Sequence, residues 1–172
     1  MTKRMIRFII ELVSIALLIV LDQITKIWAV ATLKGGNIIE LIPGVLEFNY
    51  LENKGAAFGI LQNRQTVFVI AGAIILFFLI FILFIMPQQK KYYAANVIFV
   101  LIAAGAIGNM IDRVRLNYVI DFIYFRLIDF PVFNVADMYV SVSTVVLCLL
   151  ILFYYKEEDL AVFVPKKKDK TI

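Results

Sequence analysis

Two aspartates have the surroundings expected of an acid–base pair. Asp121 is the one acid within the mostly apolar residues 118–124, and Asp137 follows sixteen positions later in residues 133–137. A turn at residues 129–131 can fold one segment back onto the other. Two adjacent carboxylates do not both ionise cheaply, so one keeps a proton and the other acts as a base. Such a pair can activate water and protonate an amide leaving group.

Asp137 also has a structural interpretation. If Asn134 caps the helix that follows, Asp137 occupies its third position, as in a capping box. On its own this reading is as good as the catalytic one.

Five more polar residues lie within or at the end of apolar runs, where charge is expensive in a membrane. Asp22 and Lys26 are four positions apart and share a helix face, which favours an ion pair that supports or positions a site. Asn109, Asp112 and Arg113 can share one face at the end of another run. An arginine there is also favoured by the helix dipole alone.

The residue types exclude several other chemistries. The chain has no histidine and a single cysteine, Cys148, within an apolar run. This removes His-dependent nucleophilic sites, His-ligated metals and Cys clusters, and we expect neither metal nor cofactor. Cys148 is interpreted as a small buried hydrophobe. The net charge of +4 comes from Lys and Arg beside apolar runs, which favours lipid contact over nucleic acid.

The elements that must position these residues are membrane helices. With 63% hydrophobic and 17% charged residues, the chain exposes more apolar surface than a water-soluble core can hide. A bilayer core needs about 20 apolar helical residues. We expect one domain over residues 1–172, with spans at about 8–33, 67–86, 92–111 and 138–155. We expect the first to be a membrane helix rather than a cleavable leader, because its polar cluster lies within the span.

Charge bias orients the spans. The N-terminal end, residues 87–92 and the tail hold ten Lys and Arg, against six in residues 34–66 and 112–137. We therefore expect cytoplasmic termini and two extracytoplasmic connections. Alternation over residues 46–51, between glycine-rich turns, predicts a small β element, and residues 112–137 predict an interfacial helix. The predicted fold class is an all-α membrane protein with these two additions.

Five sequence blocks then occur in a familiar order. They are DQITK (22–26), NKGAAFG (53–59), GAIGNMIDR (105–113), VIDF (119–122) and FNVAD (133–137). Across nearly the whole chain this resembles bacterial lipoprotein signal peptidase, also called signal peptidase II.

The resemblance implies an aspartyl endopeptidase of the bacterial cytoplasmic membrane. Such enzymes cut a prolipoprotein before its diacylglyceryl-modified cysteine, at the extracytoplasmic face. Asp121 and Asp137 would be the catalytic dyad. Matching positions that bind substrate or support the dyad are Asp22, Lys26, Asn53, Gly55, Asn109, Asp112, Arg113 and Asn134. The family also implies a cradle of outer strands, and a surface helix over the cleft at residues 112–135. Its partners would be the lipidated substrate and membrane lipid, and we expect a monomer.

The departures from the family pattern are mild and leave the dyad intact. Tyr124 replaces a second acid found in many members, and Met138 with Tyr139 replaces smaller residues. Either could alter the rim of the cleft.

Three other functions remain as hypotheses. A Ser–Lys protease would use Lys26 with Ser141 or Ser143, although Asp22 would keep that amine protonated. A small transporter or channel subunit would use Asp22 and Lys26. A catalytically dead relative would only bind precursors, and nothing in the sequence favours it.

Overall fold

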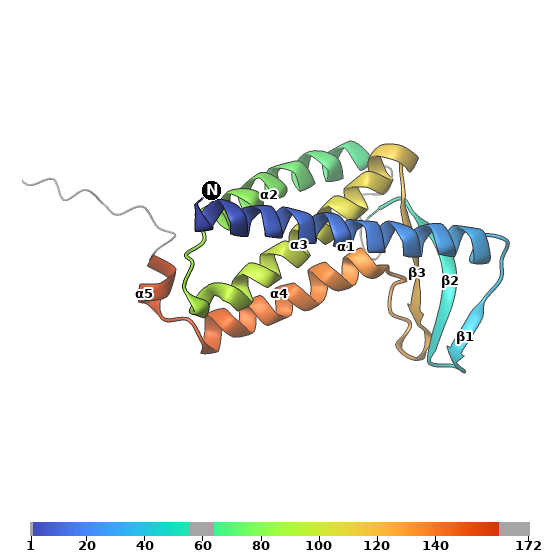
Figure 1. Ribbon diagram of the computed structural model, residues 1–172. Helices are drawn as coiled ribbons and strands as arrows, with labels where there is room; N and C mark the ends of the chain where they lie inside the picture. The colour runs from blue at the N-terminus through green and yellow to red at the C-terminus, as the bar shows by residue number, and fades with distance from the viewer. Residues whose placement is uncertain (1, 56–63, 162–172) are drawn as a thin grey trace, which may run out of the picture.

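Four long helices form the body of the molecule. The computed structural model describes residues 2–55 and 64–161. The long helices are α1 (Lys3–Leu33), α2 (Gln65–Ile85), α3 (Tyr93–Leu116) and α4 (Val135–Phe153). They run side by side, with a small sheet at the end opposite the N-terminus (Figure 1).

Within the described residues, three helices are long and apolar enough to cross a membrane: α2, α3 extended back to Lys90, and α4. Their bounds agree with the predicted spans to within a few residues, apart from the end of α3, which runs on to Leu116. The first helix is 31 residues long but carries Glu11, Asp22 and Lys26 as buried polar residues.

The outer surface of the bundle is apolar. Leu17, Ile27, Phe77 and Leu152 are each more than three-fifths exposed. An exposed apolar surface of this kind suits contact with lipid chains rather than water. Cys148 belongs to it, because the thiol residue is exposed rather than buried as predicted.

The helix α3 lies at the centre of the bundle, packed against α1, α2 and α4. Its contact with α4 depends on Gly105. A Cβ atom there would lie 2.5 Å from the backbone oxygen of Ala136 and 2.8 Å from Val140 Cγ2. Small residues at such crossings let helix backbones approach closely.

Three antiparallel strands make the sheet, in the order β1 (Ile39–Ile42), β2 (Leu46–Asn53) and β3 (Val119–Phe125). The predicted β element is therefore present, and Gly44, with φ of 71°, makes the predicted turn between its first two strands. Phe48 and Tyr50 pack with Phe122 against the end of α1, as the alternation indicated. Glu47, which alternates with Phe48 along β2, is also buried and bonds Arg126 at 3.4 Å.

The predicted interfacial helix over residues 112–137 is wrong. Residues 112–116 finish α3, residues 119–125 form β3, and only the short 3-10 helix η3 (Arg126–Ile128) is helical before α4. The physical reason is that residues 118–125 are β-branched or aromatic apart from Asp121, and such side chains suit a strand paired with β2. The family's surface helix therefore does not correspond to residues 112–135 here.

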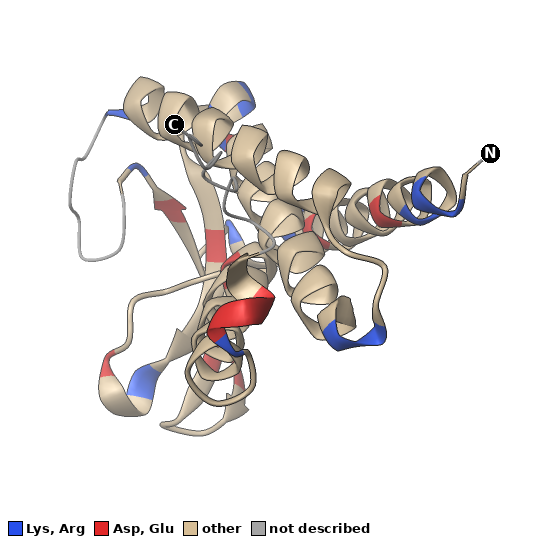
Figure 2. Ribbon diagram, turned by 90° about the vertical axis from the view of Figure 1, so that its left-hand side faces the viewer, with Lys and Arg blue, Asp and Glu red and all other residues tan. Residues whose placement is uncertain are grey.

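A polar cluster joins the helices at the end of the bundle opposite the sheet, where Lys and Arg gather at the start of α1 (Figure 2). Arg7 pairs with Glu11 at 3.0 Å and donates to the carbonyls of Pro87 and Met86. Asn96 donates to Glu11 at 2.6 Å. These contacts tie α1 to α3 and to the end of α2. The 3-10 helix η2 (Lys90–Tyr92) and the short helix α5 (Glu157–Leu160) complete this end.

Candidate active site

The two predicted catalytic aspartates come from different elements and face one cavity of about 290 Å³. Asp121 lies in the middle of β3, opposite Leu51 of β2. Asp137 lies in the first turn of α4. The chain returns from β3 through a left-handed residue, Asp129, and Phe133 then pairs with Ile123. This return, predicted from the turn residues, brings α4 to the edge of β3.

Asp121 is held by two amide donors. Asn53 Nδ2 donates to one carboxyl oxygen at 2.8 Å, and Asn134 Nδ2 donates to the other at 2.6 Å. The residue is only 1% exposed. Burial, reinforced by the negative charge of Asp137, raises the pKa of the Asp121 carboxyl to about 7, although the two amides oppose the shift. A carboxyl with this pKa can hold or release a proton near neutral pH.

Asp137 is fixed by the capping box that the sequence predicted. Asn134 Oδ1 accepts from the Asp137 backbone N–H at 2.9 Å, and Asp137 Oδ2 accepts from the Asn134 backbone N–H at 3.1 Å. The other carboxyl oxygen accepts from Asn109 Nδ2 at 2.7 Å. The cap and the site are therefore one structure, because Asn134 bonds both aspartates.

A buried ion cluster supports this amide network from behind. Lys26 Nζ lies 3.0 Å from Asp22 and 2.9 Å from Asp112, so the predicted ion pair has a second acid as well. All three residues are at most 2% exposed. The same ammonium donates to Asn109 Oδ1 at 2.8 Å, which fixes the orientation of the Asn109 amide toward Asp137.

Two members of the cluster also fix backbone. Asp22 accepts from the Ala136 N–H at 3.0 Å, next to Asp137, and Asp112 accepts from the Ile120 N–H at 3.2 Å, next to Asp121. Each acid thus holds the segment that carries one of the two dyad residues.

Sequence reasoning assigned no role to Gln23, which donates to Asp22 at 3.2 Å and to Asp112 at 3.1 Å. Ser141, considered only as a nucleophile for Lys26, instead lines the cavity one turn beyond Asp137. A polar side chain inside an apolar run was the available signal for both residues.

Arg113 lies at the rim of the site. It lines the cavity, its guanidinium stacks over Phe68 at 4.8 Å, and it donates weakly to the Asn109 carbonyl at 3.4 Å. The Arg113 Nε atom is buried with no hydrogen-bond partner among the described residues. Its positive charge is therefore available to a polar group that enters the cavity.

Gly55 completes the set. It lines the cavity and donates its N–H to Asn53 Oδ1 at 3.0 Å, which orients the amide that holds Asp121. All ten predicted site residues therefore belong to one connected network or cavity. The remainder of the second sequence block, residues 56–59, lies outside the described residues.

The Ser–Lys hypothesis is weakened by these contacts. Lys26 is fully engaged by two carboxylates and an amide oxygen, so it is not available as a base. Ser143 is buried on α4 with no partner for its hydroxyl among residues 2–55 and 64–161. Over the same residues, no group of three His, Cys, Asp or Glu side chains could hold a metal ion.

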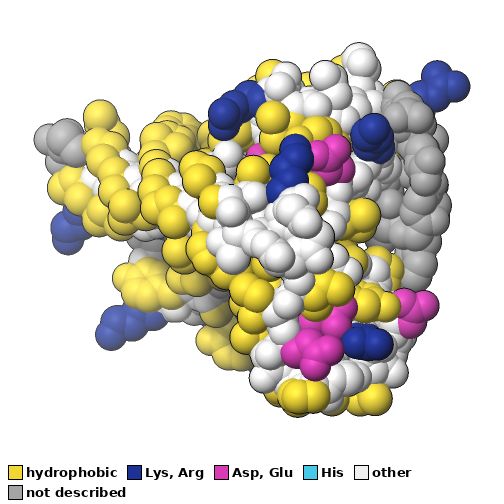
Figure 3. Space-filling model, turned by 90° about the vertical axis from the view of Figure 1, so that its right-hand side faces the viewer, with side chains coloured by type: hydrophobic (Ala, Val, Ile, Leu, Met, Phe, Trp, Pro, Cys, Tyr) yellow, Lys and Arg dark blue, Asp and Glu magenta, His cyan; other side chains and the backbone are white. Residues whose placement is uncertain are grey.

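The face that carries the sheet is more polar than the helix bundle. Acidic and basic side chains lie beside one another on it (Figure 3). Arg126 contributes, at 3.5 Å from Glu40 and 3.4 Å from Glu47. The aspartate cavity opens where this polar end meets the apolar helices, because its lining comes from the sheet, from residues 130–133 and from α3 and α4.

A helical membrane body with a buried carboxylate site at one end defines a candidate membrane hydrolase. Comparison with known proteins identifies the family. The model of the family described as signal peptidase (SPase) II matches residues 14–153. The chain therefore belongs to the signal peptidase II family and is a membrane protease.

Individual proteins with similar sequences or structures support this family assignment. The chain is 40% identical to the lipoprotein signal peptidases of two Streptococcus pyogenes strains, serotype M5 Manfredo and serotype M18 MGAS8232, over 85% of this chain and 93% of each relative. Two solved structures, each titled as a bacterial membrane enzyme structure, superpose with a TM-score of 0.73. One is 33% identical and covers 93% of this chain, and the other is 35% identical and covers 84%. Each match spans 94% of the solved chain.

Proposed function

We propose that this protein removes the signal peptide from prolipoproteins by cutting before the diacylglyceryl-modified cysteine, using Asp121 and Asp137 as an aspartyl dyad. The observation that carries the proposal is that these two acids, from β3 and α4, face one cavity and are held by a shared set of amides. Membership of the signal peptidase II family supports the substrate class.

The reaction needs one proton and one base at the dyad. Asp121, with its pKa near 7, is suited to hold the shared proton, and Asp137 removes a proton from water. The water oxygen bonds to the scissile carbonyl carbon. The C–N bond then breaks, and the leaving amine of the cysteine takes a proton from the dyad.

The amides position the pair rather than react. Asn53 and Asn134 hold Asp121, and Asn109 with the Asn134 backbone holds Asp137. Because each amide is itself fixed by Gly55, Lys26 or the helix cap, the carboxyls are preorganised before substrate binds. Arg113 would bind a carbonyl or ester oxygen of the substrate.

We further propose that α1 is the fourth membrane span. Beyond its basic first turns, its charged residues are Glu11, Asp22 and Lys26, all buried inside the bundle, and its length of 31 residues exceeds what a bilayer requires. The Lys and Arg bias then places both termini in the cytoplasm and the sheet outside. The dyad would lie near the extracytoplasmic surface, where water is available.

A second cavity gives substrate a route from the membrane. It has a volume of about 310 Å³, is lined by α2, α3 and α4, and shares Asn109, Arg113, Asp137 and Ser141 with the aspartate cavity. A substrate whose acyl chains stay in the bilayer can enter sideways along this surface. The transporter hypothesis is not favoured, because Asp22 and Lys26 are fully buried and paired with each other.

The direct experiment uses purified protein in detergent with a lipid-modified prolipoprotein, followed by gel shift. Wild type should cleave, whereas Asp121→Asn and Asp137→Asn should not. The matched control is Asp129→Asn, because Asp129 is an exposed acid on the same connection and should be dispensable. All four proteins should elute as folded species.

Two outcomes would contradict the proposal. Cleavage by either dyad variant at the wild-type rate would remove that aspartate from the mechanism. Equal cleavage of an unlipidated precursor would remove the lipid requirement.

A further inference from the structure

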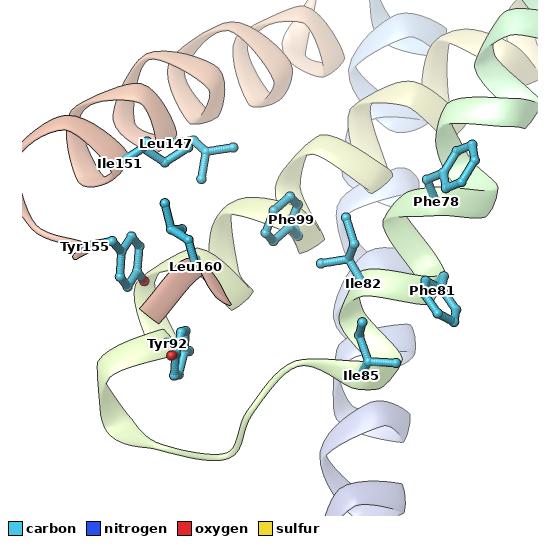
Figure 4. Close-up of a pocket in the computed structure, with 11 residues that line it drawn as sticks. Phe78, Phe81, Ile82, Ile85, Tyr92, Phe99, Leu147, Ile151, Tyr155 and Leu160 are labelled. Carbon is cyan, nitrogen blue, oxygen red and sulfur yellow. The ribbon is translucent and has the colours of Figure 1, made fainter. Parts of the chain in front are cut away.

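A third cavity lies at the inner end of the bundle, far from the aspartates. It has a volume of about 320 Å³ and an almost wholly apolar lining from α2, α3, α4 and the C-terminal segment. The side chains that enclose it include Phe81, Ile85, Phe99, Leu147, Ile151 and Leu160. Figure 4 shows them around the space between α4 and α2, with α3 behind.

This inner cavity and the cavity of about 310 Å³ beside the dyad, which we call the outer cavity, are lined by the same three helices. On α4, Val140 lines the outer cavity and Leu147 the inner one, seven positions apart and therefore on one helix face. On α2, Ile75 lines the outer cavity and Phe78 the inner one, three positions apart. From Asp137 to Ile151 the α4 helix rises about 21 Å. The two cavities therefore lie one after the other along α2, α3 and α4, the first of them beside the dyad, and we name the two together the groove.

At the inner end of the groove the lining includes Tyr155 and Leu160, the two ends of residues 155–160, which we name the C-terminal strap. Leu160, at its end, lies beside Tyr155 and Phe99 in the cavity wall (Figure 4). Side-chain contacts hold the strap against the residues that begin α3. Asp159 pairs with Lys91, and its carbonyl accepts from the Tyr92 hydroxyl at 3.1 Å.

Further contacts hold the beginning of the strap. The Tyr155 hydroxyl donates to the Lys91 carbonyl at 3.1 Å, and its ring stacks on Tyr92 with centroids 5.8 Å apart. The Lys156 N–H donates to Asp159 at 2.9 Å, which fixes the first turn of α5. Together these contacts make the strap a fixed wall across the groove.

We propose that the inner cavity receives the inner end of the substrate's hydrophobic signal-peptide helix, and that the C-terminal strap limits the length of helix that can be cleaved. This proposal rests on the proposed function. The hydrophobic region of a signal peptide has about 7 to 15 residues, and 15 residues of helix measure about 22 Å. That length matches the groove from the dyad to the strap. The occupant is the peptide helix because the groove begins at the site where its peptide bond is cut.

The test measures kcat/KM for lipidated substrates that differ only in their hydrophobic segment, at about 11, 14, 17 and 20 residues. Wild type should cleave the two shorter substrates well and the longest at least about tenfold less well, because an extra turn meets the strap. Leu160→Ala should restore cleavage of the longer substrates. Leu160→Trp should shift the optimum toward shorter segments by about one helical turn.

Leu152→Ala is the matched control. This leucine is near the same end of the bundle but is 72% exposed and does not line the cavity, so its length profile should equal that of wild type. Melting temperatures measured in parallel identify any variant that is simply unfolded. In that event Asp159→Asn, which weakens the Lys91 pair without changing the cavity wall, should broaden the length profile in place of Leu160→Ala.

The outcomes separate this proposal from the proposed function. If wild type cleaves no substrate of any length, the proposed function fails. If it cleaves all lengths equally, or if the Leu160 variants keep the wild-type profile, the function stands and the strap proposal is wrong. A rate that follows the acyl-chain length of the surrounding phospholipid instead would show that a membrane lipid fills the cavity, which also overturns the proposal.

Discussion

Lys26 is the single cation in a buried cluster with two carboxylates, and its replacement by methionine is the most informative perturbation of this structure. The ammonium is 1% exposed, and Asp22 and Asp112 lie within 3.0 Å of it. Methionine has a similar length and no charge. Lys26→Met therefore leaves two buried acids close together with no cation between them, and it also removes the donor that orients Asn109.

The magnitude follows from the charges. Removing one partner of a buried ion pair costs about 3 to 5 kcal/mol, and Lys26→Met should reach the upper end because two acids lose their partner. Asp22→Asn should cost only about 2 kcal/mol. It leaves Lys26 paired with Asp112, and an asparagine oxygen can still accept from the Ala136 N–H. In the double variant Lys26→Met with Asp22→Asn, Asp112 is the one acid left in the cluster and can stay buried in its protonated form. The stability costs of the two substitutions should therefore not add.

The assay is thermal unfolding in detergent together with prolipoprotein cleavage. Lys26→Met should lower Tm by about 10 to 20 °C, and Asp22→Asn by less than half of that. Lys34→Met is the control, because Lys34 also pairs with an acid, Glu52 at 3.0 Å, but is half exposed, so its pair should contribute little to stability. Equal losses for Lys26→Met and Asp22→Asn, or a loss for Lys26→Met no larger than for Lys34→Met, would refute this account of the cluster.

Three further predictions concern the site and the packing beside it. Because the folded pKa of Asp121 is about 7 against an ordinary 3.8, the native state binds this proton more tightly than the unfolded chain. Cleavage should decline as pH rises through about 7. Stability should fall between about pH 4 and 7 in wild type, and the fall should be smaller in Asp121→Asn, where only Asp137 remains of the pair. A cleavage rate still rising above pH 8 would contradict the assignment of the proton. Gly105→Ala should destabilise the protein by about 1 to 3 kcal/mol, because the new Cβ would lie 2.5 Å from the Ala136 carbonyl oxygen. Gly72→Ala is the control and should be neutral or stabilising, because its Cβ would meet only the flexible Met110 side chain at 3.8 Å. Equal melting temperatures for the two variants would show that α3 and α4 can separate. Chelation by EDTA should leave the cleavage rate unchanged, and restoration of a lost rate by added metal would overturn the dyad mechanism.

Much of this architecture was predictable because lipid imposes a simple rule on composition. The uncharged run in α2 and the apolar runs in α3 and α4 could only be long helices, and their ends followed from Pro87 and from the charged residues around them. The capping box at Asn134 could also be predicted, because a polar N-cap residue followed three positions later by an acid is a local sequence pattern. Local rules of this kind require no knowledge of the rest of the fold.

Non-local partners could not be predicted in the same way. The i to i+4 spacing of Asp22 and Lys26 predicted one ion pair, but not that Asp112, 86 positions beyond Lys26, is the second acid of the cluster. The Arg7 and Glu11 contacts with the ends of α2 and α3 were missed, since Arg7 resembled an ordinary flanking charge. Residues 118–125 were misassigned because strand and interfacial helix share an aromatic and charged composition, and only pairing with β2 decides between them.

The position of Asn134 has a consequence for the order in which the protein is made. This one side chain bonds Asp121 before it in the sequence and caps the helix that carries Asp137 after it. A nascent chain that ends after β3 holds one acid of the pair and the Asn53 amide, but lacks both the Asn134 amide and the second acid. On the proposed mechanism, proteolytic activity appears only when the last helix docks, so completion of the chain is itself the activation step and no removable pro-segment is needed to keep the unfinished enzyme silent.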